Sequence, residues 1–211
     1  DELALEAMLR LAGLVLGDAG LARSSLGWRG PLDAQGRHGL VVDAMQVDRD
    51  GTRVHSASRR RVVQAGAQGD LGAATHYTLQ FGTLDLSAQD PQGLNAAELA
   101  GDREAASPNA LKFDTRKTVR QRQAGARIEH DLGATQRLTL TAYAGTRRTA
   151  QMLAVPVSAQ AAPTSGGGAI DLDRGYGGID LRWRRSGRWL ALPFTLPASI
   201  HRETSDETRR G

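Results

Sequence analysis

The chain has 211 residues, of which 40% are hydrophobic, with a mean hydropathy of −0.39, a formal net charge of +4 and no cysteine. The lack of cysteine excludes a disulfide scaffold, a thiolate metal site and a cysteine nucleophile. The sequence contains no apolar run long enough for a transmembrane helix. Arginines are spread along the chain, and RKTVRQRQ at 116–123 has no aromatic stacking partners, so we expect no nucleic-acid partner.

Residues 1–20 form an atypical N-terminal segment that we expect to be helical. The stretch DELALEAMLRLAGLVLG is rich in Ala, Leu, Glu and Met, which are good helix formers. Its acidic start lacks the basic region of a secretory signal peptide. The closing residues ETRRG are predicted to lie in a loop. We therefore expect both ends to be cut from a longer chain.

After Gly20 the pattern changes to the two-residue alternation of β-strands, with glycine-rich turns between the strands. Leu138 and Leu140, for example, alternate with Thr139 and Thr141. About eight long strands are predicted, at 21–30, 37–48, 60–68, 74–86, 116–130, 134–148, 176–186 and 191–202. This order indicates an all-β fold, an antiparallel meander.

The predicted connections alternate between short and long. Short turns are predicted at 31–36, 69–73, 131–133 and 186–190, and long polar connections at 49–59, 87–115 and 149–175. This asymmetry is typical of outer-membrane barrels, which have tight periplasmic turns and long extracellular loops. Residues 21–211 are therefore predicted to form a partial transmembrane β-barrel, although an aromatic content of 4% is low for aromatic girdles.

Several longer segments resemble the barrel region of TonB-dependent outer-membrane receptors, most closely the siderophore and ferric-chelate branch. These segments are DGTRVHSASRR (50–60), AQDPQGL (88–94), FDTRKTVRQRQAGARIEH (113–130), AYAGTRRTAQMLAVPVSAQAAPTSGGGAIDLDRGYGGIDLRW (142–183) and the closing DETRRG. The resemblance implies a barrel of roughly 22 strands around an N-terminal plug. It implies uptake of a ferric siderophore or similar nutrient through the bacterial outer membrane, driven by the TonB complex through the plug. It implies transport and no enzymatic activity.

The resemblance covers only part of such a receptor. The 211 residues contain no match to the plug or its TonB box and about eight of the strands, so we expect a barrel-region fragment. Pro193 and Pro197 depart from the family pattern, because proline cannot donate a hydrogen bond to a strand ladder. The terminal strand that ends in an aromatic residue is also absent from these residues.

No catalytic or metal-binding set emerges from the sequence, and we expect no cofactor. The five histidines are scattered, and no pair has the spacing of metal ligands. The densest basic cluster contains Arg53, Arg59 and Arg60, which we expect to attract an anionic ferric chelate at the barrel mouth. Contact with lipopolysaccharide phosphates, or a solvated loop, is the alternative. Gln151 and Met152 belong to a second candidate ligand-facing loop at 149–164.

The alternation also predicts which solvent each face meets. We expect Leu138 and Leu140 to face outer-membrane lipid, and Thr139, Thr141 and Tyr143 to face a wet lumen. Three other interpretations stay open. The chain could be a self-contained eight-stranded outer-membrane barrel that acts as an adhesin or structural protein. It could be a soluble β-domain that binds a ligand, or a truncated product without a function of its own.

Overall fold

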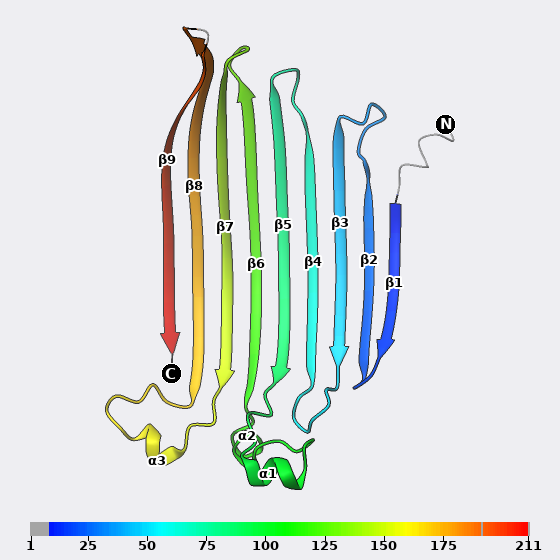
Figure 1. Ribbon diagram of the computed structural model, residues 1–211, viewed down its shortest axis with the longest axis vertical. Coiled ribbons are helices and arrows are strands. Elements are labelled where there is room, and N and C mark those ends of the chain that lie inside the picture. Colours follow the sequence, from blue (N-terminus) through cyan, green and yellow to red (C-terminus); the bar gives the residue numbers. More distant parts are fainter. Residues whose placement is uncertain (1–8, 191, 211) are drawn as a thin grey trace.

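The computed structural model describes residues 9–190 and 192–210, which form one nine-stranded antiparallel sheet in strict sequence order (Figure 1). The strands are β1 (Leu9–Gly17), β2 (Leu21–Pro31), β3 (His38–Arg49), β4 (Ser58–Asp70), β5 (Thr75–Gln89), β6 (Arg116–Asp131), β7 (Gln136–Met152), β8 (Ala169–Trp189) and β9 (Leu192–Arg210). Three short helices, α1 (Ala96–Gly101), α2 (Pro108–Phe113) and α3 (Val157–Gln160), lie in loops at one end of the sheet (Figure 1). The predicted all-β meander is confirmed.

The predicted N-terminal helix is wrong for residues 9–17, which form strand β1 instead. Nine consecutive residues of this segment pair with β2, from Leu9 opposite Arg29 to Gly17 opposite Leu21. Ladder hydrogen bonds and pairing with a neighbouring strand outweigh the weak intrinsic preference of Leu and Ala for helix. The rest of the predicted helix, residues 1–8, lies outside the described residues.

The closing residues are also strand rather than loop, because β9 continues through 203–210 and pairs with β8 as far as Arg210 opposite Asp171. Charged residues at this end of the strand had suggested a loop. Long strands that extend beyond an apolar region carry such residues on both faces. For the same reason β7 continues to Met152 and β8 begins at Ala169, so that the predicted loop at 149–175 shortens to 153–168.

Pro193 and Pro197 fit into β9 because their nitrogens point away from β8. The Ser186 amide donates to the Thr135 carbonyl at 2.8 Å, so even-numbered residues of β8 direct their backbone groups toward β7. Pro193 and Pro197 lie opposite Arg188 and Arg184 in the register. Their own backbone groups therefore point to the open side of β9, where no ladder among the described residues needs a donor.

The two ends of the sheet differ as the sequence predicts. Short turns at 32–37, 71–74 and 132–135 lie at one end, and the loops at 50–57, 90–115 and 153–168 lie at the other, which we call the long-loop end (Figure 1). In the first short turn the Asp33 carboxylate accepts the amides of Arg37 at 2.8 Å and His38 at 3.3 Å. Burial alone would raise the pKa of Asp33, but these backbone donors, with the nearby charges, lower it overall.

The sheet is a single layer, so it has two exposed faces and almost no interior. Among the described residues, the buried apolar side chains are Ala106, Ala110 and Val119, all at the long-loop end. Thr115, which is completely buried, donates its hydroxyl to the Asp90 carbonyl at 2.5 Å. The described part of the chain contains no helix that is long and apolar enough to cross a membrane.

Alternation and register together define the two faces. We call them the Leu140 face and the Tyr143 face, after neighbouring residues of β7. In the strands, the exposed large apolar side chains lie almost entirely on the Leu140 face, with Val15 the exception among the described residues. On the Leu140 face they are Leu14, Leu16, Leu26, Val63, Leu79, Phe81, Ile128, Met152, Ile179, Leu181, Trp189, Leu192, Leu196 and Ile200.

Candidate ligand-facing surface

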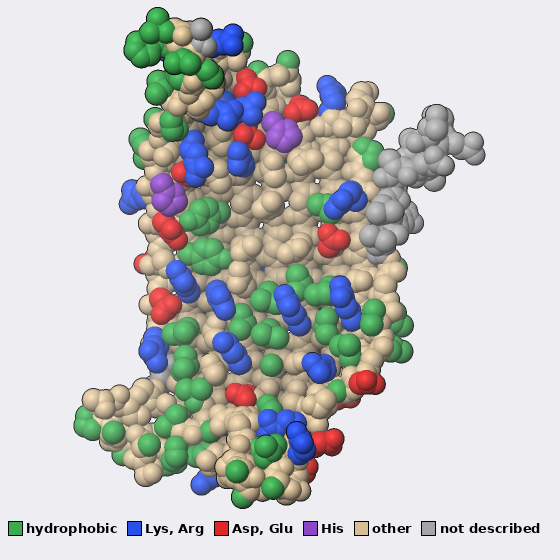
Figure 2. All heavy atoms as spheres, in the orientation of Figure 1, with side chains coloured by type: hydrophobic (Ala, Val, Ile, Leu, Met, Phe, Trp, Pro, Cys, Tyr) green, Lys and Arg blue, Asp and Glu red, His purple; other side chains and the backbone are tan. Residues whose placement is uncertain are grey.

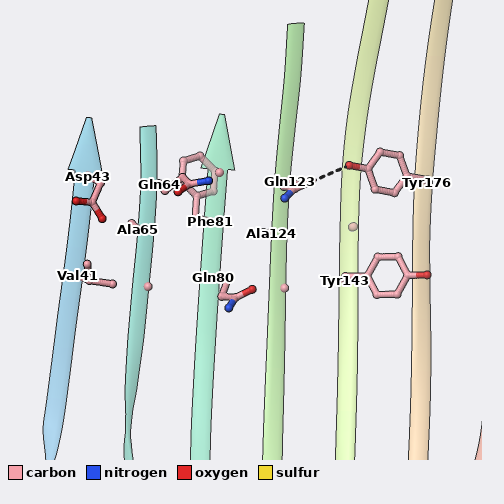
Figure 3. Close-up of a pocket in the computed structure, with 14 residues that line it drawn as sticks. Val41, Asp43, Gln64, Ala65, Gln80, Phe81, Gln123, Ala124, Tyr143 and Tyr176 are labelled. Carbon is pink, nitrogen blue, oxygen red and sulfur yellow. Dashed lines mark hydrogen bonds between the residues drawn. The ribbon is translucent and has the colours of Figure 1, made fainter. Parts of the chain in front are cut away.

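A hollow with polar side chains around it lies on the Tyr143 face. It has a volume of about 450 Å³ and extends from β3 to β8, near the middle of the sheet (Figure 3). Direct cross-strand pairing places its residues side by side, because the register joins Asp43 to Gln64 and Gln80 to Gly125. The side chains that line it include Asp43, Gln64, Gln80, Gln123, Tyr143 and Tyr176.

Two tyrosines at one side of this hollow lie over glycines of the neighbouring strand. Tyr143 of β7 pairs with Gly178 of β8, and Tyr176 of β8 pairs with Gly145 of β7. A Cβ atom at Gly178 would lie 2.6 Å from the Tyr143 ring, and one at Gly145 would lie 2.5 Å from the Tyr176 ring. The rings therefore lie flat on the sheet because glycine leaves the space, and each covers backbone that a glycine exposes.

Hydrogen bonds fix the orientation of Tyr176. Its hydroxyl donates to Gln123 Oε1 at 3.2 Å, as the dashed line in Figure 3 marks. Gln121 Nε2 donates to the same Gln123 oxygen at 2.8 Å. These groups are neutral, so the hollow offers amide and phenol groups to a ligand, with Asp43 as the one charged side chain that lines it.

Between this hollow and the long-loop end, the Tyr143 face carries a set of basic side chains that we call the inner cations. Figure 2 shows lysine and arginine side chains gathered among hydrophobic ones over this half of the sheet. Registers of β2 to β9 place the inner cations on one face, with Glu207 as the acidic side chain among them. The inner cations are Arg23, Arg49, Arg60, Lys117, Arg147, Arg174 and Arg209.

No inner cation forms an ion pair with an acidic side chain of the described residues. Arg174 makes neutral contacts only: its Nε donates to Ser205 Oγ at 2.8 Å, and its guanidinium lies 6.0 Å from the centre of the Tyr176 ring. An uncompensated group of like charges raises the local positive potential and attracts anions.

On the opposite face and at the same end of the sheet, three arginines are paired with aspartates. Arg59 is paired with Asp48, Arg120 lies 3.7 Å from Asp85, and Arg148 lies 2.7 Å from Asp171. At the short-turn end of the Tyr143 face, Arg137 pairs with Asp131 at 2.6 Å. The inner cations are therefore a group of basic side chains on one face and at one end of the sheet that has no ion-pair partners among the described residues.

The residues predicted from sequence to contact a ligand do not lie together. Arg60 and Gln151 are on the Tyr143 face, and Arg60 belongs to the inner cations. Arg59 and Met152 are on the Leu140 face, and Arg59 is paired with Asp48. Gln151 and Met152 were predicted in a loop but are the last two residues of β7.

Arg53, the fifth predicted residue, holds two loops together. Its guanidinium donates to the carbonyl oxygens of Ala105 at 2.9 and 3.0 Å and of Gln92 at 2.7 Å. Nearby, His55 Nε2 lies 2.8 Å from the Thr115 carbonyl. These contacts fasten the 50–57 loop to the 90–115 loop. Because the donors of Arg53 are occupied by backbone carbonyls, the inner cations are better candidates for ligand contact than Arg53.

Six of the seven inner cations were missed from sequence. Arg23 and Arg174 have no basic neighbour in the sequence, and Arg147 has only Arg148, whereas the sequence prediction relied on denser runs of basic residues. The signal was present in the alternation, because each lies on the same side of its strand as Tyr143 or its cross-strand partners. The strand registers are needed to show that these residues, which are distant in the sequence, share one face.

Among the described residues, no three His, Asp or Glu side chains are placed to hold a metal ion together. The surface can therefore offer guanidinium, amide and phenol donors to a bound molecule. Such groups recognise anionic oxygen atoms through charge-assisted hydrogen bonds.

No family model matches the sequence. The fold, however, is similar to several solved receptors. The closed form of the ferric-catecholate import receptor Fiu from E. coli K12 matches with a TM-score of 0.74 and 14% identity, over 97% of this chain and 32% of that one. FpvA of P. aeruginosa, bound to heterologous pyoverdines, matches with a TM-score of 0.74 and 14% identity, over 95% of this chain and 28% of that one.

BauA, the ferric preacinetobactin receptor from Acinetobacter baumannii, matches with a TM-score of 0.71 and 11% identity, over 96% of this chain and 31% of that one. The chain thus spans a third or less of the length of each of these receptors. In fold, it is similar to the barrel portion of TonB-dependent siderophore receptors, as the sequence resemblance predicts.

Proposed function

We propose that the chain forms part of the barrel wall of an outer-membrane receptor that takes up a ferric siderophore or a similar scarce nutrient. One observation carries this proposal: a sheet with the fold of a receptor barrel exposes its large apolar side chains on one face and unpaired cations on the other. In this proposal the Leu140 face meets lipid and the Tyr143 face lines the lumen. The energy for uptake would come from the TonB complex through a plug domain.

The position of the apolar residues supports a membrane location. On β2 the apolar residues centre near Gly27. Following the direct cross-strand partner from each strand to the next leads from Gly27 to Ser205 on β9. On β9 they centre instead near Pro197. The apolar band is thus displaced by about eight residues, or ~26 Å, over seven strand spacings that measure ~34 Å. A displacement of this size corresponds to strands tilted by roughly 40° from the band normal, as membrane barrels require.

A soluble domain would have to cover this band with other parts of the protein. Leu14, Leu26 and Ile200 have exposed fractions of 70%, 62% and 75%, and no second layer packs on the Leu140 face within the described residues. A contiguous apolar surface of this kind is typical of a membrane or protein interface. The self-contained eight-stranded barrel receives no support, because nine strands are present and the described β1 and β9 do not pair.

The inner cations support an anionic nutrient. A ferric tris-catecholate or ferric citrate carries negative charge, and seven basic side chains near the long loops would attract it before it reaches the hollow with its amide and phenol groups. Arginine forms two parallel hydrogen bonds to a carboxylate or similar oxygen pair, which adds geometric selectivity.

Binding to the purified chain in detergent micelles tests this function. The probes are an anionic ferric tris-catecholate and a neutral ferric tris-hydroxamate of similar size. We expect tighter binding of the anionic chelate, and weaker binding as salt is raised. Replacing Arg60→Gln together with Arg147→Gln should weaken it by about tenfold or more.

The matched control is Arg59→Gln with Arg148→Gln, which changes the adjacent residues and removes the same charge from the opposite face. This control should leave chelate affinity within about twofold, because long-range effects are screened over a Debye length of about 10 Å. Equal losses in both double variants, or equal affinity for the two chelates, would contradict the proposal.

A further inference from the structure

Three arginines lie directly at the long-loop border of the apolar band on the Leu140 face. Arg61 on β4 lies two residues beyond Val63, Arg122 on β6 two residues beyond Ala124, and Arg202 on β9 two residues beyond Ile200. We call these three residues the rim arginines. Each is the first side chain of that face on its strand after the apolar residues end.

The rim arginines lie along one line that follows the slant of the band. The row of Arg61 leads through Asp85 to Arg120 on β6, so Arg122 is displaced from that row by two residues. The row of Arg122 leads through Thr146 and Gly175 to Asp206 on β9, so Arg202 is displaced by four. The displacement is about one residue per strand, which equals that of the apolar band. In a tilted barrel, all three would lie at one depth in the membrane.

No rim arginine lies within ion-pair distance of a carboxylate of the described residues, although Arg61 is the direct cross-strand partner of Asp85. Arg61 Nε donates to the neutral Gln46 Oε1 at 3.0 Å. On β4 and β6, the next arginines of this face toward the long loops, Arg59 and Arg120, are paired with aspartates. A line of guanidinium groups without ion pairs at the edge of an apolar surface matches an amphiphile with anionic phosphate above acyl chains.

We propose that the rim arginines bind the phosphates of a diphosphorylated glycolipid of the leaflet on the long-loop side, whose acyl chains lie on the apolar band. The inference rests on the membrane location proposed above. Guanidinium groups bind phosphate through parallel hydrogen bonds. Arg61 and Arg122 are two strands and two residues apart, or about 12 Å, so one lipid with two phosphates can engage both, whereas a lipid with one phosphate cannot.

The test is lipid binding by the full chain in detergent micelles, measured by native mass spectrometry. The probes are diphosphorylated lipid A, its monophosphorylated form and phosphatidylglycerol. We expect diphosphorylated lipid A to bind at least about tenfold more tightly than the other two lipids. Substituting Arg61→Gln, Arg122→Gln and Arg202→Gln together should weaken its binding by roughly 100-fold, at about fivefold per arginine.

The control triple variant is Arg60→Gln, Arg147→Gln and Arg174→Gln, which removes the same charge from the Tyr143 face and should retain lipid affinity. Equal losses in both triple variants, or equal affinity for all three lipids, would overturn the rim proposal. Chelate binding, measured on the same preparations, separates the two proposals: the rim triple variant should bind ferric tris-catecholate like the unsubstituted chain. If the unsubstituted chain binds no lipid at all, the membrane location fails together with the rim.

Discussion

Arg59 and Arg60 are adjacent in the sequence, yet Arg59 is paired with Asp48 whereas Arg60 has no carboxylate partner within the described residues. The same contrast holds for Arg148, paired with Asp171, and Arg147. Strand alternation sends neighbouring residues to opposite faces, so adjacent arginines of one run meet different partners. The difference teaches that basic clusters in a strand must be divided by face before a function is assigned to them.

The largest expected difference in stability between the two faces is between alanine substitutions at two glycines, Gly145 opposite Tyr176 and Gly175 on the other face. Gly145→Ala should destabilise the chain by about 1–3 kcal/mol, because its methyl group would overlap the Tyr176 ring and approach the Arg122 carbonyl. Gly175→Ala on the neighbouring strand is the control on the Leu140 face, where the added Cβ has no atom within 4 Å. Urea unfolding in micelles measures both. A Gly145→Ala variant as stable as Gly175→Ala would show that the ring does not lie on the sheet.

A smaller effect on stability should separate the adjacent arginines. Arg59→Gln removes an ion pair with Asp48 and should lower stability slightly, since exposed ion pairs contribute little. Arg60→Gln removes one of several uncompensated like charges and should leave stability unchanged or raise it slightly. The same urea titration compares them, and a larger loss for Arg60→Gln would mean that the inner cations have structural partners.

The fold was predictable because its signals are local. Two-residue alternation, as in Leu138 to Tyr143, and the spacing of glycine-rich turns locate eight of the nine strands. Strand β1 escaped prediction because its composition favours helix, and only its pairing with β2 makes it a strand. The ends of β8 and β9 escaped because charged residues continue the strands beyond the apolar band.

The candidate site was less predictable, because it depends on register. Arg60 was predicted within a dense run, but Arg23 and Arg174 are more than a hundred residues apart and share a face only through six strand pairings. Arg53 belongs to the same run as Arg60 and yet donates to the carbonyls of Ala105 and Gln92. Proximity in sequence could not distinguish an arginine that fastens two loops from one that is free to meet a ligand.

Cysteine accessibility on β7 tests the assignment of the two faces most directly, and the native chain has no cysteine to interfere. Single substitutions Leu138→Cys, Thr139→Cys, Leu140→Cys and Thr141→Cys would be labelled with a water-soluble maleimide in membranes that contain the protein. The account predicts that the two threonine positions react and the two leucine positions are protected by lipid. Reaction at the leucine positions with protection at the threonine positions would invert the faces. Equal reaction at all four would contradict the membrane location.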